Sequence, residues 1–79
     1  MIVGAFHAPD AERNLRVFSR KFDLPLCTTA NGCFTQVFAR GTQPPIDEGW
    51  ALEADLDLQW AHAIAPGAKL VLVEASSNN

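Results

Sequence analysis

Two carboxylates, Glu53 and Asp57, lie four residues apart in the segment GWALEADLDLQWAHAIAPGAK, residues 49 to 69. At about 100° per residue they sit roughly 40° apart on a helix, on the side that also carries Leu56, Trp60 and Ile64. A carboxylate in an apolar stripe loses hydration and is repelled by a second one a turn away, so one proton shared between the two is favoured. Two acids with different proton affinities are suited to acid–base catalysis. The spacing also fits a second interpretation, in which the pair lies at the edge of the stripe, paired with an arginine or solvated.

The composition restricts the classes of protein to consider. The 79 residues are 48% hydrophobic and 19% charged, with a formal net charge of -3. Enough apolar area is present for folding, but a chain of this length buries only about 60 to 65% of its unfolded surface. Without a basic cluster we expect no nucleic-acid partner, and without an apolar run of roughly 18 to 20 residues we expect no membrane span. The start, MIVGAFHAPD, does not have the pattern of a signal peptide.

Hydrophobic periodicity and breaker residues predict five elements. They are a strand at residues 2–6, a helix at 10–22, a strand at 34–39, a helix at 48–65 with Asp47 as N-cap, and a strand at 69–74. This alternation predicts an α/β fold with a partial parallel sheet and right-handed crossover helices. The continuous apolar run of the last strand is typical of a strand covered on both faces. Two helices cannot provide that cover, so we expect residues 1–79 to be part of a larger, doubly wound domain.

The segments around the acid pair resemble those of a known family. The sequence GWALEADLDLQWAHAIAPGAKLVLVEA is similar to the helix and following strand of the sedolisins, which are serine-carboxyl peptidases with a subtilisin-like fold. The family pattern is Glu-x-x-x-Asp followed by an ALAPGA-type turn, here Glu53, Asp57 and residues 65–68. The earlier segment IVGAFHAPDAERNLRVFSRKFDLPLCTTANGCF also resembles the front of bacterial sedolisin-like proteins. The resemblance runs over almost the whole chain, which would be the N-terminal part of a catalytic domain.

The resemblance implies a serine-type, acid-acting endopeptidase. Glu53 would be the general base toward a serine hydroxyl, and Asp57 would hold the position and proton of Glu53. The family's Gly-Thr-Ser segment and its oxyanion aspartate are not in this sequence, so we expect the chain alone to be inactive. The implied partners are a protein or peptide substrate and the remainder of the catalytic domain. The implied cofactor is calcium, with ligands beyond residue 79, and the implied location is extracellular.

One position departs from the family pattern. Many relatives have Val-Asp-Ala-Tyr at the end of the first strand, where this chain has VGAF, residues 3–6. Support for the acid pair from that strand is therefore not expected. We also expect His7, a lone loop histidine, to be a surface residue that does not replace the missing acid.

Cys27 and Cys33 are six residues apart around a polar turn. This is not the spacing of a zinc or redox Cys-x-x-Cys motif, and with only His7 and His62 as further ligands no metal site is expected. A local disulfide fits better and favours an exported protein, whereas two free thiols remain possible in a cytosolic one. His62 points away from Asp57 on the helix, as a structural or solvated histidine.

A second hypothesis involves no catalysis. The chain would then be an α/β remnant or a small interaction module, in which Glu53 and Asp57 are structural and an exposed sheet edge binds another chain.

Overall fold

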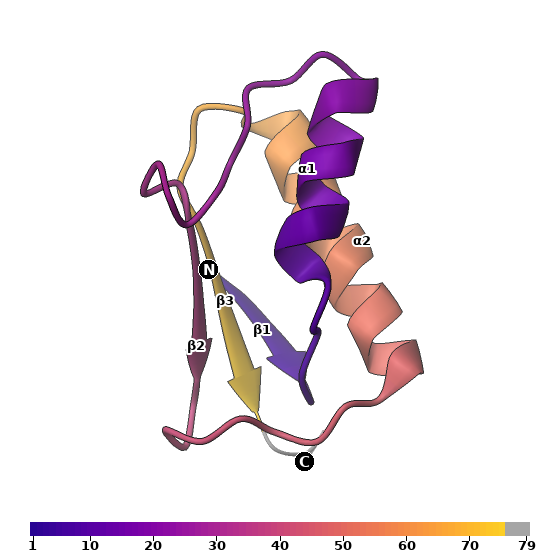
Figure 1. Ribbon diagram of the computed structural model, residues 1–79, viewed down its shortest axis with the longest axis vertical. Coiled ribbons are helices and arrows are strands. Elements are labelled where there is room, and N and C mark those ends of the chain that lie inside the picture. The colour runs from indigo at the N-terminus through magenta and orange to yellow at the C-terminus, as the bar shows by residue number, and fades with distance from the viewer. Residues whose placement is uncertain (76–79) are drawn as a thin grey trace.

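The computed structural model describes residues 1–75 as three strands and two helices in the order β-α-β-α-β (Figure 1). All five predicted elements are present, with ends that differ from the prediction by one residue at most. The elements are β1 (Ile2–Ala5), α1 (Ala11–Lys21), β2 (Phe34–Phe38), α2 (Glu48–Ile64) and β3 (Leu70–Ala75).

The strands form one parallel sheet in the order β1-β3-β2, so the last strand lies in the middle. In the register of the sheet, Leu72 lies opposite Ile2 on one side and Gln36 on the other. The α/β fold with a partial parallel sheet and crossover helices is therefore as predicted. The central strand is the most apolar one, because its side chains lie between those of two neighbouring strands on each face of the sheet.

Both helices pack on the same face of the sheet, side by side (Figure 1). One core joins Leu15 of α1 and Leu58 of α2 to Phe34, Leu70 and Leu72, which all point to that face. A methyl group added to Gly4 in β1 would contact Leu72 and Ala54 of α2 at 3.6 and 3.7 Å. Small residues therefore let α2 lie close against the sheet.

The two crossovers have opposite hands. The chain moves across the sheet from β1 to β2 over α1, and back from β2 to β3 over α2, on the same face. Because the direction reverses and the face does not, one crossover must be left-handed. The prediction of right-handed crossovers is therefore wrong for one of them, although about 98% of such connections are right-handed. The hand was decided by burying both apolar helix faces in one core.

The opposite face of the sheet carries β-branched side chains. Val3 is 65% exposed and Val37 is 40% exposed, and Val71 and Val73 of the central strand are half-buried between them. Within residues 1–75, β3 is therefore covered on one face, where the sequence predicted cover on both. A parallel sheet usually has both faces covered, so this face has the composition of one that packs against further structure.

Local interactions define the ends of the helices. The Asp47 side chain accepts a hydrogen bond from the backbone N of Trp50 at 3.1 Å, so Asp47 is the predicted N-cap of α2. At the end of α1, Asp23 adopts a positive φ of 56°, and the backbone N of Leu24 donates to the Ser19 carbonyl at 2.8 Å. This is a Schellman-type stop.

Candidate functional site

Glu53 and Asp57 lie one turn apart on α2, and both are exposed. The phase of the helix turns them away from the sheet, because its buried face consists of Ala54, Leu58 and His62. Within residues 1–75 neither carboxylate forms an ion pair. Within this chain both acids are therefore solvated, as the second interpretation of the pair expected, and burial does not remove their hydration.

The prediction of which face of α2 packs on the sheet was wrong. Periodicity assigned Leu56, Trp60 and Ile64 to the inner side, but they are 43, 68 and 76% exposed. Apolar residues occur on most sides of this helix, so periodicity alone could not choose among them. Close contact between α2 and Gly4 favours the side with Ala54, since bulky side chains such as Trp60 would not fit there. His62 has a structural role, which was one of the two roles predicted for it.

An apolar groove runs between the two helices. Its volume is about 420 Å³, and it is lined by Phe18, Phe22, Leu24, Leu56, Gln59, Trp60 and Ala63. Leu56 and Trp60 line this groove from the exposed side of α2 that also carries Glu53 and Asp57. The acid pair is thus adjacent to an open apolar surface.

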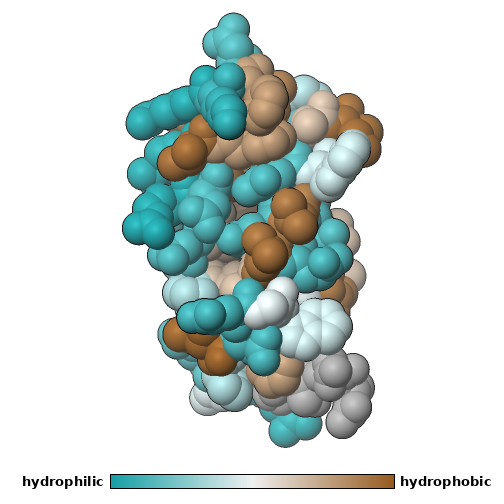
Figure 2. All heavy atoms as spheres, turned by 90° about the vertical axis from the view of Figure 1, so that its right-hand side faces the viewer, coloured by the Kyte–Doolittle hydropathy of each residue, from teal (hydrophilic) through white to brown (hydrophobic). Residues whose placement is uncertain are grey.

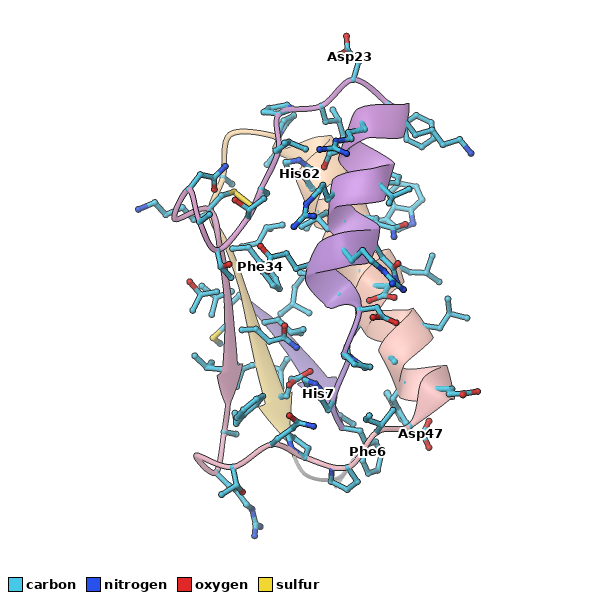
Figure 3. All side chains as sticks on the ribbon, viewed as in Figure 1. Phe6, His7, Asp23, Phe34, Asp47 and His62 are labelled. Atoms are coloured by element: carbon cyan, nitrogen blue, oxygen red, sulfur yellow. A yellow bond between two sulfur atoms is a disulfide. The ribbon has the colours of Figure 1, made fainter. Side chains whose placement is uncertain are left out.

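A second polar cluster, which sequence reasoning missed, lies where β1 and β3 end (Figure 3). Glu74 is only 1% exposed. Its carboxylate accepts hydrogen bonds from the backbone N of Ala8 at 2.6 Å and from Nε2 of Gln36 at 2.9 Å, and lies 2.8 Å from Nδ1 of His7. The cluster joins the loop after β1 to both other strands.

The backbone before His7 is unusual. Phe6 has a φ of 65°, a left-handed conformation that a bulky residue rarely adopts. Phe6 donates its backbone N–H to the Ala75 carbonyl at 2.7 Å, and His7 donates its own to the Pro45 carbonyl at 2.8 Å. The chain therefore turns sharply after β1 and brings the imidazole of His7 to the buried carboxylate of Glu74.

The prediction that His7 is a surface residue was wrong, because its side chain is only 13% exposed. With Nδ1–H donating to Glu74, the neutral imidazole keeps its lone pair on Nε2. The ring also meets Phe38 edge-on, at 5.7 Å between centroids. A usable signal was present in the sequence: Leu70, Leu72 and Glu74 share one face of a strand, so a buried acid needing a partner could have been predicted.

Asp55 is a third acid with an uncommon environment. Its Oδ2 accepts a hydrogen bond from Nδ2 of Asn14 at 2.7 Å, while its Oδ1 is buried without a partner. Burial raises the pKa of Asp55, the hydrogen bond from Asn14 opposes this rise, and the negative charge of Asp10 adds to it. The contact between Asp55 and Asn14 joins α2 to α1 at a defined height.

The predicted disulfide between Cys27 and Cys33 is present. Cys27 is fully buried in the core. Nε2 of His62 lies 2.7 Å from the Pro25 carbonyl, and so holds the segment before the disulfide against α2. Figure 3 shows His62 and His7 toward opposite ends of the sheet, so the disulfide loop is remote from the His7–Glu74 cluster.

The residues that the structure describes bring no three His, Cys, Asp or Glu side chains together as a metal ion requires. Residues 1–75 therefore do not form a calcium site, and the calcium that the family resemblance implies, with ligands beyond residue 79, stays a prediction. None of the helices within residues 1–75 has the length and apolar character needed to cross a membrane.

Comparisons of the chain with protein-family models, with curated proteins and with solved structures found no match.

Proposed function

We propose that this chain is part of the catalytic domain of a secreted, acid-acting serine endopeptidase of the sedolisin class. Its substrates would be proteins or peptides. The proposal rests on the resemblance of the Glu53 and Asp57 segment to that family. The disulfide supports the secreted part of the proposal, because disulfides persist in oxidising compartments.

The structural observation that supports the proposal is the exposure of both carboxylates on one side of α2. A general base must reach the hydroxyl whose proton it takes, which a sealed carboxylate cannot do. In the proposed reaction Glu53 takes the proton of the serine hydroxyl while the serine oxygen attacks the peptide carbonyl. In that reaction Asp57, one turn away, would hydrogen-bond Glu53 and keep it oriented.

The serine must come from chain outside residues 1–79, since the family's Gly-Thr-Ser segment is not in this sequence. We therefore expect the isolated chain to be inactive. The segment carrying the serine would approach the exposed side of α2, beside Leu56 and Trp60. A carboxylate general base with a second carboxylate beside it is the arrangement that the family resemblance links to activity in acid.

The test uses the complete gene product that contains these residues. Peptidase activity is measured in acid on a denatured protein, for the parent and for Glu53→Gln and Asp57→Asn. We expect each variant to lose at least about a hundredfold in kcat, as removal of an acid–base group typically costs. Glu48→Gln is the matched control, because Glu48 is an exposed acid on the same helix. Near-parent activity in either site variant, or a gene product without an in-frame Gly-Thr-Ser segment, would contradict the proposal.

The second candidate, an interaction module without catalysis, is favoured by the exposed apolar surfaces of the chain. Trp60 is 68% exposed on the helical side and Val3 is 65% exposed on the open face of the sheet. A purified chain that unfolds cooperatively and binds a protein partner or a second copy through these surfaces would favour a self-sufficient module. A chain that binds hydrophobic dye and does not unfold cooperatively would favour an incomplete catalytic domain.

A further inference from the structure

The outer surface of the helical layer carries a line of large apolar side chains. Figure 2 shows brown side chains reaching the surface along the middle of this side, among teal hydrophilic ones. Six residues of the two helices and of the C-cap of α1 are between 43 and 76% exposed: Val17, Phe22, Leu52, Leu56, Trp60 and Ile64. We call them the apolar seam. Monomeric proteins rarely expose a continuous apolar patch larger than a few hundred Å².

The charges of the two helices are of opposite sign. Helix α1 contains Arg13, Arg16, Arg20 and Lys21 against the single acid Glu12. Helix α2 contains Glu48, Glu53, Asp55 and Asp57, and has no Lys or Arg. The net charge of -3 conceals this separation.

The positions of the charges follow from the buried faces. Phe18 of α1 and its C-cap Phe22 line the groove toward α2, and at about 100° per residue Arg16 falls on the flank of α1 away from α2. In α2, Leu56 and Trp60 line the same groove, and Glu53 and Asp57 fall on the flank away from α1. Across the layer the surface is therefore basic, then apolar, then acidic.

The heights of the charges along the helices also match. The hydrogen bond between Asn14 and Asp55 places these two residues level with each other. Both helices run antiparallel to the strands and so in the same direction (Figure 1). Arg16 follows Asn14 by two residues, as Asp57 follows Asp55, so Arg16 and Asp57 stand at one height on opposite flanks. Arg13 and Glu53 are nearly level as well.

We propose that the apolar seam is a docking surface for a second copy of this chain. A two-fold axis parallel to the helices exchanges the left and right flanks and preserves the height. It places the basic flank of each copy, on α1, against the acidic flank of its partner, on α2. Arg16 then lies opposite Asp57 and Arg13 opposite Glu53, and the two apolar seams are in contact between these charged flanks. Such a dimer is isologous and closed. Charge pairs flank its apolar seam, as they do in helical bundles, where they determine partner choice.

The exposed area of the apolar seam is close to what a second copy of the chain would need as a partner. With ordinary side-chain areas, the seam exposes roughly 600 to 700 Å² per copy, against about 800 Å² per partner in a standard interface. Trp60, the largest and one of the most exposed members, would enter the groove of the other copy, as aromatic anchors do in interfaces. The charge pairs at the rim contribute mainly to orientation and to partner choice.

This inference goes beyond the proposed peptidase function and does not depend on it. In the dimer, Glu53 and Asp57 face the partner's arginines. The face that would receive the serine-bearing segment is then covered, so dimerisation and completion of the catalytic site exclude each other.

The first test is sedimentation velocity of the 79-residue chain over a concentration series. We expect a reversible monomer–dimer equilibrium, and we expect Trp60→Ala to weaken it by roughly tenfold or more, as loss of an aromatic anchor does. Val3→Ser is the matched control, because Val3 is exposed to a similar degree on the open sheet face. A chain that is monomeric at every concentration would overturn the proposal. So would a dimer that is lost with Val3→Ser and kept with Trp60→Ala.

The second test exchanges the charges. One variant carries R13E and R16E, the other carries E53K and D57K, and far-UV circular dichroism verifies that both are folded. We expect each variant alone to be monomeric, because like charges then meet at both rims. We expect an equimolar mixture to form a heterodimer with at least the parent's affinity. A mixture that stays monomeric, or single variants that dimerise as the parent does, would overturn the arrangement.

Discussion

Replacing Glu74 with Gln tests the buried cluster at the carboxyl ends of the strands. In the parent, the carboxylate accepts from Ala8 N at 2.6 Å and from Gln36 Nε2 at 2.9 Å, and is paired with His7 at 2.8 Å. The shape of the side chain is almost unchanged by the substitution. One acceptor oxygen becomes an NH₂ group, which must then face one of these donors.

The expected loss in the free energy of unfolding depends on the burial of Glu74. Because Glu74 is only 1% exposed, solvent does not weaken its interactions. A hydrogen bond to a charged group contributes about 1.5 to 3 kcal/mol, and a buried donor left without a partner costs about 1 to 3 kcal/mol. The amide can keep some of these contacts in weaker form. We therefore expect Glu74→Gln to lower the free energy of unfolding by roughly 2 to 4 kcal/mol. A chain of this length has about 4 to 12 kcal/mol in total.

The assay is urea unfolding followed by far-UV circular dichroism, with the midpoint and the slope fitted separately. A lower midpoint with an unchanged slope reports lost stability alone. Glu48→Gln is the control, since an exposed acid without a buried partner should change stability by less than about 0.5 kcal/mol. If Glu74→Gln unfolds within the range of this control, Glu74 does not hold the three strand ends together.

Three further substitutions test the core, the helix pair and a helix end, each measured by the same urea assay. Leu58→Ala, at a fully buried position of α2, should cost about 2 to 5 kcal/mol, and a cost below 1 kcal/mol would show that α2 does not pack through this face. Asp55→Asn should stabilise the chain slightly at neutral pH. Burial raises the pKa of Asp55 above 3.8, so its ionised form destabilises the folded state. This penalty should fade as the pH falls through the folded-state pKa of Asp55 toward 3.8, and the stability advantage of the Asn variant should fade with it. An advantage that stays constant with pH would contradict a raised pKa of Asp55. Asp23→Gly should stabilise by up to about 1 kcal/mol, since Gly adopts the observed φ of 56° without strain, and a loss would contradict the Schellman-type stop.

The elements of this fold could be read from the sequence because each depends on residues close in the chain. Asp47 begins α2 with its own side chain, and Pro66-Gly67 follow the helix where the predicted end lies. The disulfide was predictable for the same reason, since Cys27 and Cys33 are joined by a short polar turn. The positions of Glu53 and Asp57 relative to each other were also predictable, because the helical period sets them.

The packed face of α2 could not be read from periodicity, because apolar residues occupy most sides of this helix. The choice depended on volume: Ala54 fits against Gly4 and Leu72, and Trp60 does not. The His7 environment depended on a backbone turn at Phe6 that no local propensity favours. Both outcomes are set by contacts between residues about 50 to 70 positions apart in the chain, which no local pattern encodes.

The sequence by itself determined the order and extent of the helices and strands, the disulfide, and the pairing of two carboxylates on one helix. These follow from hydrophobic period, capping and short-range covalent constraint. Only the tertiary structure decided that the carboxylates face outward, that one crossover is left-handed, and that Glu74 is buried with His7 as its partner. The physical reason is that both helices share one face of the sheet, and close packing there selects which side chains are enclosed.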